Sequence, residues 1–197
     1  DDPSGQDTSC DKCKITSNSD LKWYVDAWII PHANHFCGEV IGDWEVGRVT
    51  DMSNVFSGKS TFNADISKWN TASVTSLYKT FYDAISFTGD GVSNWDTSKV
   101  TTLEQTFVRA RSFNSDLSNW NTSRVTSLYG TFLGATSFTG GGLSNWDTSR
   151  VTSLRQTFSG ATSFTGDEVS NWDTSKVTTL YFTFSSATSF TGDGLSN

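Results

Sequence analysis

The chain has little of what usually marks a disordered, membrane-spanning or catalytic protein. Only two of its 197 residues are proline and 14% are aromatic, which argues against a disordered low-complexity protein. No apolar run approaches the roughly 18 residues of a transmembrane helix, so we expect no insertion of this segment into a membrane. The sequence shows no initiator Met and no signal peptide, which predicts a processed chain or a fragment.

Positive charge is also scarce. Lys and Arg number 14 against 21 Asp and Glu, for a net charge of −7 and a pI near 4.6. Phosphate binding needs a basic stripe, so this balance disfavours a nucleic-acid partner and an anionic membrane surface. The two histidines do not repeat, and no Gly-rich phosphate loop or isolated carboxylate pair occurs. We therefore expect no enzyme activity, no cofactor and no metal.

What the sequence does contain is a repeat. Successive Trp residues are separated by 25, 26, 25, 26 and 26 positions, and a period in this range indicates a solenoid, in which each unit packs only against its neighbours. Twelve of the 14 Phe occupy two further repeat positions, so the large side chains are expected to stack as a hydrophobic ladder. The Trp positions of this structural ladder are Trp44, Trp69, Trp95, Trp120, Trp146 and Trp172.

The spacing within one repeat predicts an α/β fold class. Apolar residues in 100–110 are separated by three, four and three positions, which is one face of a short helical segment, and residues 96–98 can cap its start. The polar stretch 113–120 is short enough for a single strand. Stacked units would pair such strands in parallel about 4.8 Å apart. The spacing leaves open whether the strand centres on Leu-Ser-Asn-Trp, which we favour, or on Val-Thr-Ser-Leu.

Two regions are expected. Residues 1–43 do not repeat and are predicted to be an N-terminal tail and a capping helix, with Asp20 or Ser19 at its start and Pro31 at its end. Residues 44–197 form six repeats of 25 or 26 residues. The chain stops within a repeat, and solenoids need capped ends, so we expect the array to continue beyond Asn197. The apolar face of the capping helix would carry Leu21, Tyr24, Val25 and Trp28.

The repeat resembles a known family. Its pattern Trp-Asp-Thr-Ser-x-Val-Thr-x-Leu-x-x-Thr-Phe-x-x-Ala-x-Ser-Phe is similar to the 26-residue bacterial surface protein repeat, a BspA-like branch of the leucine-rich repeats, over residues 44–197. Residues 125–135 carry the family core, with Thr where the family often has Met before the first Phe. The resemblance implies a leucine-rich-repeat-like solenoid in a secreted or cell-surface protein, with adhesion or protein binding outside the cell.

Function is therefore expected to be recognition. We predict a non-enzymatic extracellular or cell-surface module that binds a protein or glycan through a face built by the repeats. The alternative is a structural protein that assembles end to end with further copies into a fibre or coat. The binding face is expected to include the Ser and Asn columns Ser93, Asn94, Ser118, Asn119, Ser144, Asn145, Ser170 and Asn171.

Cysteine and asparagine supply two candidate modification sites. Cys10, Cys13 and Cys37 predict a disulfide that ties the tail to the cap, with a zinc site including His32 or His35, or free thiols, as alternatives. Asn121 begins a glycosylation sequon, Asn-Thr-Ser.

Charged and hydroxyl side chains also form columns. Aspartates at one repeat position could bind Ca²⁺, but Asp in a Gly-containing turn usually bonds its own backbone, and we favour the turn. The basic column is expected to be neutralised within and between rungs, since Asp96, Asp147 and Asp173 lie three residues before a basic residue. A threonine column could bind ice or carbohydrate, although an outer polar face is the simpler interpretation. The aspartates are Asp65, Asp90, Asp116, Asp167 and Asp193, the basic residues Arg48, Lys99, Arg124, Arg150 and Lys176, and the threonines Thr101, Thr126, Thr152 and Thr178.

Overall fold

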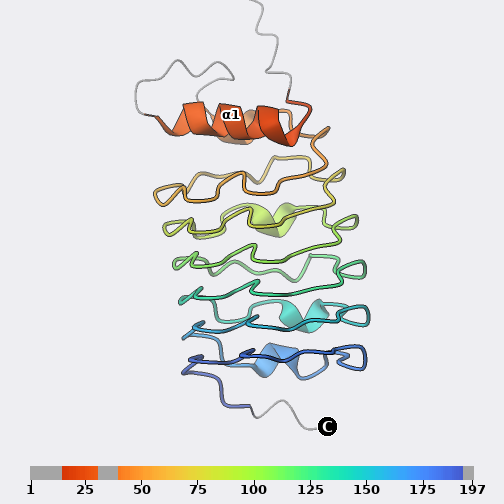
Figure 1. Cartoon of the computed structure of the whole chain (residues 1–197). Coiled ribbons are helices and arrows are strands. Elements are labelled where there is room, and N and C mark those ends of the chain that lie inside the picture. Colours follow the sequence, from red (N-terminus) through yellow and green to blue (C-terminus); the bar gives the residue numbers. More distant parts are fainter. Residues whose placement is uncertain (1–14, 31–39, 193–197) are drawn as a thin grey trace, which may run out of the picture.

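The computed structural model describes residues 15–30 and 40–192. Its helix α1, Asn18–Ile29, lies across one end of a stack of coils (Figure 1). The N-cap is Ser17, not Ser19 or Asp20, and Asp20 completes a capping box by accepting from the Ser17 backbone. Leu21 and Val25 are fully buried, so the predicted apolar face does pack on the first coil.

Below α1 the chain winds into stacked coils, one for each repeat, which we call rungs (Figure 1). The regular elements within them are four single-turn 3₁₀ helices: η1 Ile41–Asp43, η2 Val92–Asn94, η3 Leu143–Asn145 and η4 Asp167–Val169. Within the described residues, β-structure is limited to isolated parallel bridges such as Ser76↔Thr102. The predicted α/β class of parallel strands and helical segments is therefore wrong.

Consecutive turns replace the predicted helical segment. In residues 103–110 the Thr106 N–H donates to the Leu103 carbonyl at 3.2 Å, and the Ala110 N–H donates to the Phe107 carbonyl at 3.1 Å. Gln105 and Arg109, the third residue of each turn, have φ of 56° and 52°, which a right-handed helix excludes. Such turns bring every third or fourth side chain inward, as a helix does, so apolar spacing alone could not separate the two.

The strand was also misplaced. The favoured Leu-Ser-Asn-Trp segment forms the 3₁₀ turn η3, and its counterpart Val-Ser-Asn-Trp forms η2. The bridges lie instead in the Val-Thr-Ser-Leu segment, where Ser76 and Ser153 each pair with rungs on both sides. Backbone bonds between rungs continue past the bridges, and left-handed residues interrupt the extended conformation that a longer strand requires.

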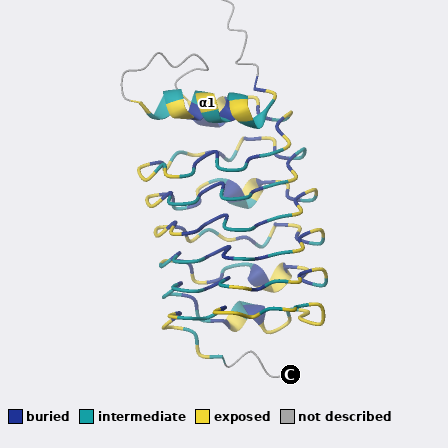
Figure 2. Cartoon of the chain, viewed as in Figure 1, coloured by how far each residue is buried: buried dark blue, intermediate teal, exposed yellow. Residues whose placement is uncertain are grey.

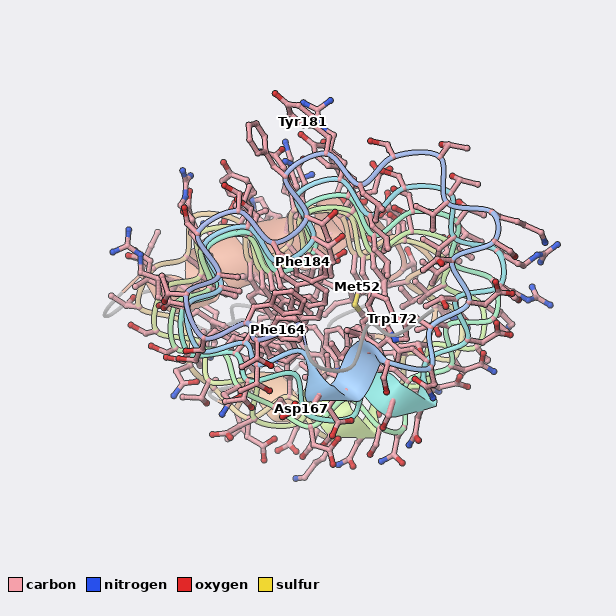
Figure 3. All side chains as sticks on the ribbon, turned by 90° about the horizontal axis from the view of Figure 1, so that it is seen from below. Met52, Phe164, Asp167, Trp172, Tyr181 and Phe184 are labelled. Carbon is pink, nitrogen blue, oxygen red and sulfur yellow. The ribbon has the colours of Figure 1, made fainter. Side chains whose placement is uncertain are left out.

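Phenylalanine rings fill the interior. The first Phe of each rung stacks on its counterpart in the next, with centroids 5.5 Å apart for Phe81–Phe107 and 5.7 Å for Phe107–Phe132. Within a rung the second Phe stacks on the first, at 3.9 Å for Phe107–Phe113. These rings are fully buried, and Figure 2 shows that exposed residues gather at the loops on either side of the stack. Phe164 and Phe184 lie in this interior in the view along the stack (Figure 3).

The tryptophans form a second interior column. Trp120 stacks on Trp146 at 6.3 Å and Trp146 on Trp172 at 6.2 Å. Their indole N–H groups donate to backbone carbonyls of the preceding rung, as Trp120 does to Val92 at 2.8 Å, so each ring is fixed in height as well as in orientation. Trp69 and Trp95 stack at 6.3 Å in the same way, whereas Trp44 meets Tyr24 of α1 edge to face at 6.3 Å.

A buried threonine supports each rung from within. Thr106 and Thr131 are fully buried, and each hydroxyl lies 3.0 Å from a carbonyl of the preceding rung, of Leu77 and Leu103 respectively. This is the position at which the resembled repeat often carries Met. A hydroxyl there satisfies backbone carbonyls that an apolar side chain would leave without this donor.

The cap supplies to the first rung what a preceding rung would supply. The Asn18 side-chain amide donates to the carbonyls of Asp51 and Ser53 at 3.0 and 2.9 Å. The first Trp differs from the others, because the buried Trp44 indole N–H has no hydrogen-bond partner among the described residues. Helix α1 therefore covers the rings and bonds two carbonyls, but it does not reproduce the indole contact of the other rungs.

Glycine absorbs the extra residue of the longer repeats. Gly142, which precedes η3, has φ of 84°, and a Cβ there would collide with the Ser118 backbone nitrogen of the preceding rung. Gly141 has an ordinary φ, and the nearest atom to a Cβ placed on it is the Asp116 Cα at 3.8 Å. A side chain can therefore be added at Gly141 without a clash, but at Gly142 it would collide with the preceding rung.

The variant Gly142→Ala should lower the free energy of unfolding by about 2 kcal/mol or more, because it combines a left-handed backbone with a steric clash. Gly141→Ala, the matched control, should change it by no more than about 0.5 kcal/mol. Urea unfolding followed by Trp fluorescence measures both. Equal midpoints for the two variants would contradict the close approach of the rungs at Gly142.

Candidate functional site

The predicted Ser and Asn columns lie on the outside, at and beside the 3₁₀ turns. Asn119, Asn145 and Asn171 are exposed, but each side-chain amide also donates to the Ser carbonyl of the preceding rung, at 3.4, 3.2 and 2.7 Å. The amides therefore brace neighbouring rungs, and only their remaining hydrogen-bonding capacity faces solvent. Through these bonds Ser93, Ser118 and Ser144 lie in line with the three asparagines. Asn94 ends η2 and Ser170 follows η4, and the 3₁₀ turns lie on the side of the stack where Figure 3 labels Asp167.

A second outer face combines hydroxyls and positive charge. From here the name basic column is kept for Lys99, Arg124, Arg150 and Lys176, because Ser73 separates Arg48 from these four successive rungs. The predicted threonine column is extended by Thr75 to Thr75, Thr101, Thr126, Thr152 and Thr178, and the side chains of both columns are exposed. Thr101, Arg124, Thr126, Arg150 and Lys176 line an open groove of about 500 Å³. The site therefore lies across several rungs and comes from residues 25 or 26 positions apart.

The predicted pairing of this basic column does not take the form of contact ion pairs in the described residues, although Lys99, Arg150 and Lys176 act on the carboxylates three residues earlier at longer range. None of its four side chains forms an ion pair with any residue in the described parts of the chain, where the ion pairs found are Lys59–Asp26, Lys68–Asp43 and Arg109–Asp83. The aspartates three positions earlier bind their own backbone instead. Asp147, for example, accepts the N–H of Ser149 at 3.0 Å and so forms an Asx turn.

These turns lower the pKa of their carboxyl groups. Hydrogen bonds from the side chain and backbone of Ser149 hold the pKa of Asp147 below its ordinary value, with Arg150 only a minor cause. Asp96 and Asp173 behave alike, with Ser98 and Ser175 as donors. The carboxylates are thus held as turn-forming acceptors.

A third face carries tyrosines, and the cations on it contact aromatic rings or a carboxylate. Arg155 lies between the rings of Tyr129 and Tyr181, 5.4 and 5.2 Å from their centroids, a cation–π arrangement that satisfies the guanidinium. Tyr181 points outward in Figure 3. On a neighbouring column Arg109 binds Asp83 at 2.5 Å. Sequence alone gave no means of separating these engaged cations from the unpaired ones.

The remaining candidates do not form a site. The carboxylates of Asp65 and Asp116 accept the N–H of Ser67 and Ser118, both at 2.8 Å, and no group of three potential metal ligands occurs among the residues that the structure describes. In residues 15–30 and 40–192, no helix has the length and apolar character to cross a bilayer.

The predicted glycosylation site lies in the described part of the chain, whereas the predicted cysteine site does not. Asn121 is exposed, and its side-chain oxygen accepts the Ser123 hydroxyl at 2.7 Å, so the predicted sequon lies on the outside of a rung. Cys10, Cys13 and Cys37, with both histidines and Asp193, lie outside the described residues.

Comparison with known proteins gives one family. A family model described as "Mycoplasma protein of unknown function, DUF285" matches residues 28–142 and 126–196. The overlapping matches cover both halves of the repeat array, as expected of a repeat-protein family. Neither the curated proteins nor the solved structures yield a significant match.

Acidification should destabilise the stack through its Asx turns. A carboxyl whose pKa is lower in the folded than in the unfolded chain adds stability above the unfolded value, and that stability is lost as the pH falls from about 4 through the folded pKa. The triple variant Asp96→Asn, Asp147→Asn, Asp173→Asn should lose less thermal stability than the parent between about pH 5 and pH 2.5.

The chain offers its own precedent for this substitution. Asn70 and Asn121 already occupy the same repeat position and accept backbone N–H groups at 3.2 and 3.1 Å. Thermal melting by circular dichroism at several pH values measures the difference. An identical acid-induced loss in parent and variant would show that these turns add no pH-dependent stability.

Proposed function

Because the chain belongs to this repeat-protein family of unknown function, we propose its role from its surface: a non-enzymatic recognition or adhesion module that binds an extended ligand, a protein or a glycan. The ligand lies along the stack and contacts several rungs at once. The module acts outside the cell or at its surface.

The observation that carries the proposal is the repetition of exposed, chemically matched side chains along one direction. In the threonine column a Thr stands at the same place on successive rungs, and in the basic column a cation does so from Lys99 to Lys176. A surface of this kind offers many weak, identical contacts, and these add up only for a ligand that is itself extended.

The interior supports a binding role over a catalytic one. Stacked rings occupy the space between the walls of each rung, with Phe107, Phe132 and Phe158 fully buried. The repeated polar groups therefore face solvent on an elongated outer surface, where contacts with another molecule can form. The resemblance to the BspA-like surface repeats supports an extracellular or surface location.

Of the two polar faces, the groove beside the basic column is the stronger binding site. The Ser and Asn columns already use amide donors to brace the rungs, as Asn171 does at 2.7 Å. The basic column has no such engagement with described residues. We therefore place the principal contact in the groove and treat the Ser and Asn columns as a possible flanking surface only.

One observation favours a second function, assembly of copies through the ends of the stack. Leu180 and Phe182 in the last described rung are 58% and 52% exposed, whereas Leu154, the counterpart of Leu180 one rung earlier, is 4% exposed. A contiguous apolar end can stack on another chain. This would make the protein a component of a fibre or coat.

The recognition function is tested by applying the purified chain at about 0.1 mM to an array of neutral glycans, acidic glycans and extracellular glycoproteins. We expect reversible binding to a subset of polymers, and weaker binding to their short fragments because fewer rungs are contacted. Heat-unfolded chain is the control. Absence of folded-state binding to every polymer would rule out the recognition function as stated.

The assembly function is tested by light scattering over a range of protein concentrations. End-to-end stacking predicts a mass that grows with concentration, and a Leu180→Glu, Phe182→Glu variant that stays monomeric because charge is placed on the apolar end. A constant monomer mass for the parent would remove this second function. It would leave the recognition function unaffected.

A further inference from the structure

We infer that the groove between the basic and threonine columns binds a linear acidic polysaccharide, a chain of sugars bearing carboxylate or sulfate groups. This inference rests on the proposed recognition function and names its ligand class. The polymer lies parallel to the stack, with its acidic groups on the basic column and its hydroxyls on the threonine column.

The charge requirement comes from four cations that form no contact ion pair with any described residue. Lys99, Arg124, Arg150 and Lys176 are exposed and occupy equivalent places on four successive rungs. The rung spacing follows from the Phe column beneath them, 5.7 Å for Phe107–Phe132 and 5.6 Å for Phe132–Phe158. Like charges at such spacing repel one another, and a line of anions relieves this repulsion.

The hydroxyl requirement comes from the threonines. Thr101, Thr152 and Thr178 donate their hydroxyl protons to the Thr carbonyl of the preceding rung, at 3.2, 3.1 and 3.0 Å. A hydroxyl whose proton is engaged in this way presents only acceptor lone pairs to a ligand. The matching ligand must therefore bring hydrogen-bond donors as well as anions, and an acidic sugar polymer carries both on every few atoms.

The same groove is poorly suited to the other polyanions. No aromatic ring lines it, so the bases of a single-stranded nucleic acid would find no stacking platform. An anionic bilayer needs a broad basic cluster or an apolar anchor, whereas this surface is one cation wide.

The test compares two triple variants of equal charge. Arg124→Gln, Arg150→Gln, Lys176→Gln removes three cations from the column. The control Lys79→Gln, Arg111→Gln, Arg155→Gln removes three cations from elsewhere on the rungs. Both variants must first show the melting temperature of the parent within a few degrees. Each loses three positive charges, so any difference reports position and not net charge.

Binding is measured by isothermal titration calorimetry with hyaluronan fragments, dextran sulfate and neutral dextran, at low and high NaCl. The parent should bind the first two and not neutral dextran, and more weakly at high salt because the charges are exposed. The column variant should bind about tenfold more weakly, the effect of losing three exposed ion pairs, and the control variant like the parent. Hyaluronan and dextran sulfate separate carboxylate from sulfate as the preferred group.

Several outcomes would overturn the inference. Equal weakening in both variants would show that only net charge matters, and binding of neutral dextran would remove the charge requirement. Tighter binding of oligothymidine or of phosphatidylglycerol vesicles than of either acidic polysaccharide would assign the groove to a nucleic acid or a membrane. If the glycan and glycoprotein array yields a ligand but the acidic polysaccharides do not bind, this inference fails and the recognition function stands; if the array also yields nothing, both fail.

Discussion

The first phenylalanine of each rung lies over the same residue of the next, at centroid separations of 5.2–5.8 Å from Phe56 to Phe184. This contact sets the height of a rung, and the backbone bonds between rungs depend on that height. The Phe107 N–H, for example, reaches the Thr131 carbonyl at 2.9 Å. Ring stacking and backbone bonding thus reinforce each other, because each requires equivalent residues of neighbouring rungs to lie in line.

Everything on the outside follows from this alignment. A side chain at a given repeat position emerges at the same place on every rung, so one choice of residue type becomes a column. Where a column lies beside an internal acceptor, its polar groups are engaged, as the amide of Asn145 is by the Ser118 carbonyl. Where a side chain makes no ion pair with a described residue and is exposed, as for Arg150, the charge stays open to a ligand. Columns whose polar groups bond a neighbouring rung stabilise the stack, and columns whose polar groups do not are the candidate binding site.

Several features could be predicted from residues alone, and others could not. The fixed Trp period and the Leu21–Val25 spacing follow from burial, which depends on residue type and position. The turns in 103–110 could not be predicted, because turn and helix place Leu103 and Phe107 on the same inner side. The open state of the basic column was equally hidden. Asp147 stands three residues from Arg150, a spacing that suits an ion pair, yet its carboxylate bonds the closer Ser149 N–H.

By itself, the sequence determined the period, the aromatic residues that form the interior and the existence of a helix before the first repeat, since these depend on apolar spacing and local capping. Only the tertiary structure decided the backbone path of each rung. Gln105, for example, has a left-handed conformation, and its N–H donates to the carbonyl of Tyr129 in the next rung, 24 residues away, at 2.9 Å. The tertiary structure likewise decided which cations are free. Whether an aspartate bonds a nearby backbone N–H or pairs with a cation depends on how neighbouring rungs are placed, and the sequence of one repeat does not contain this information.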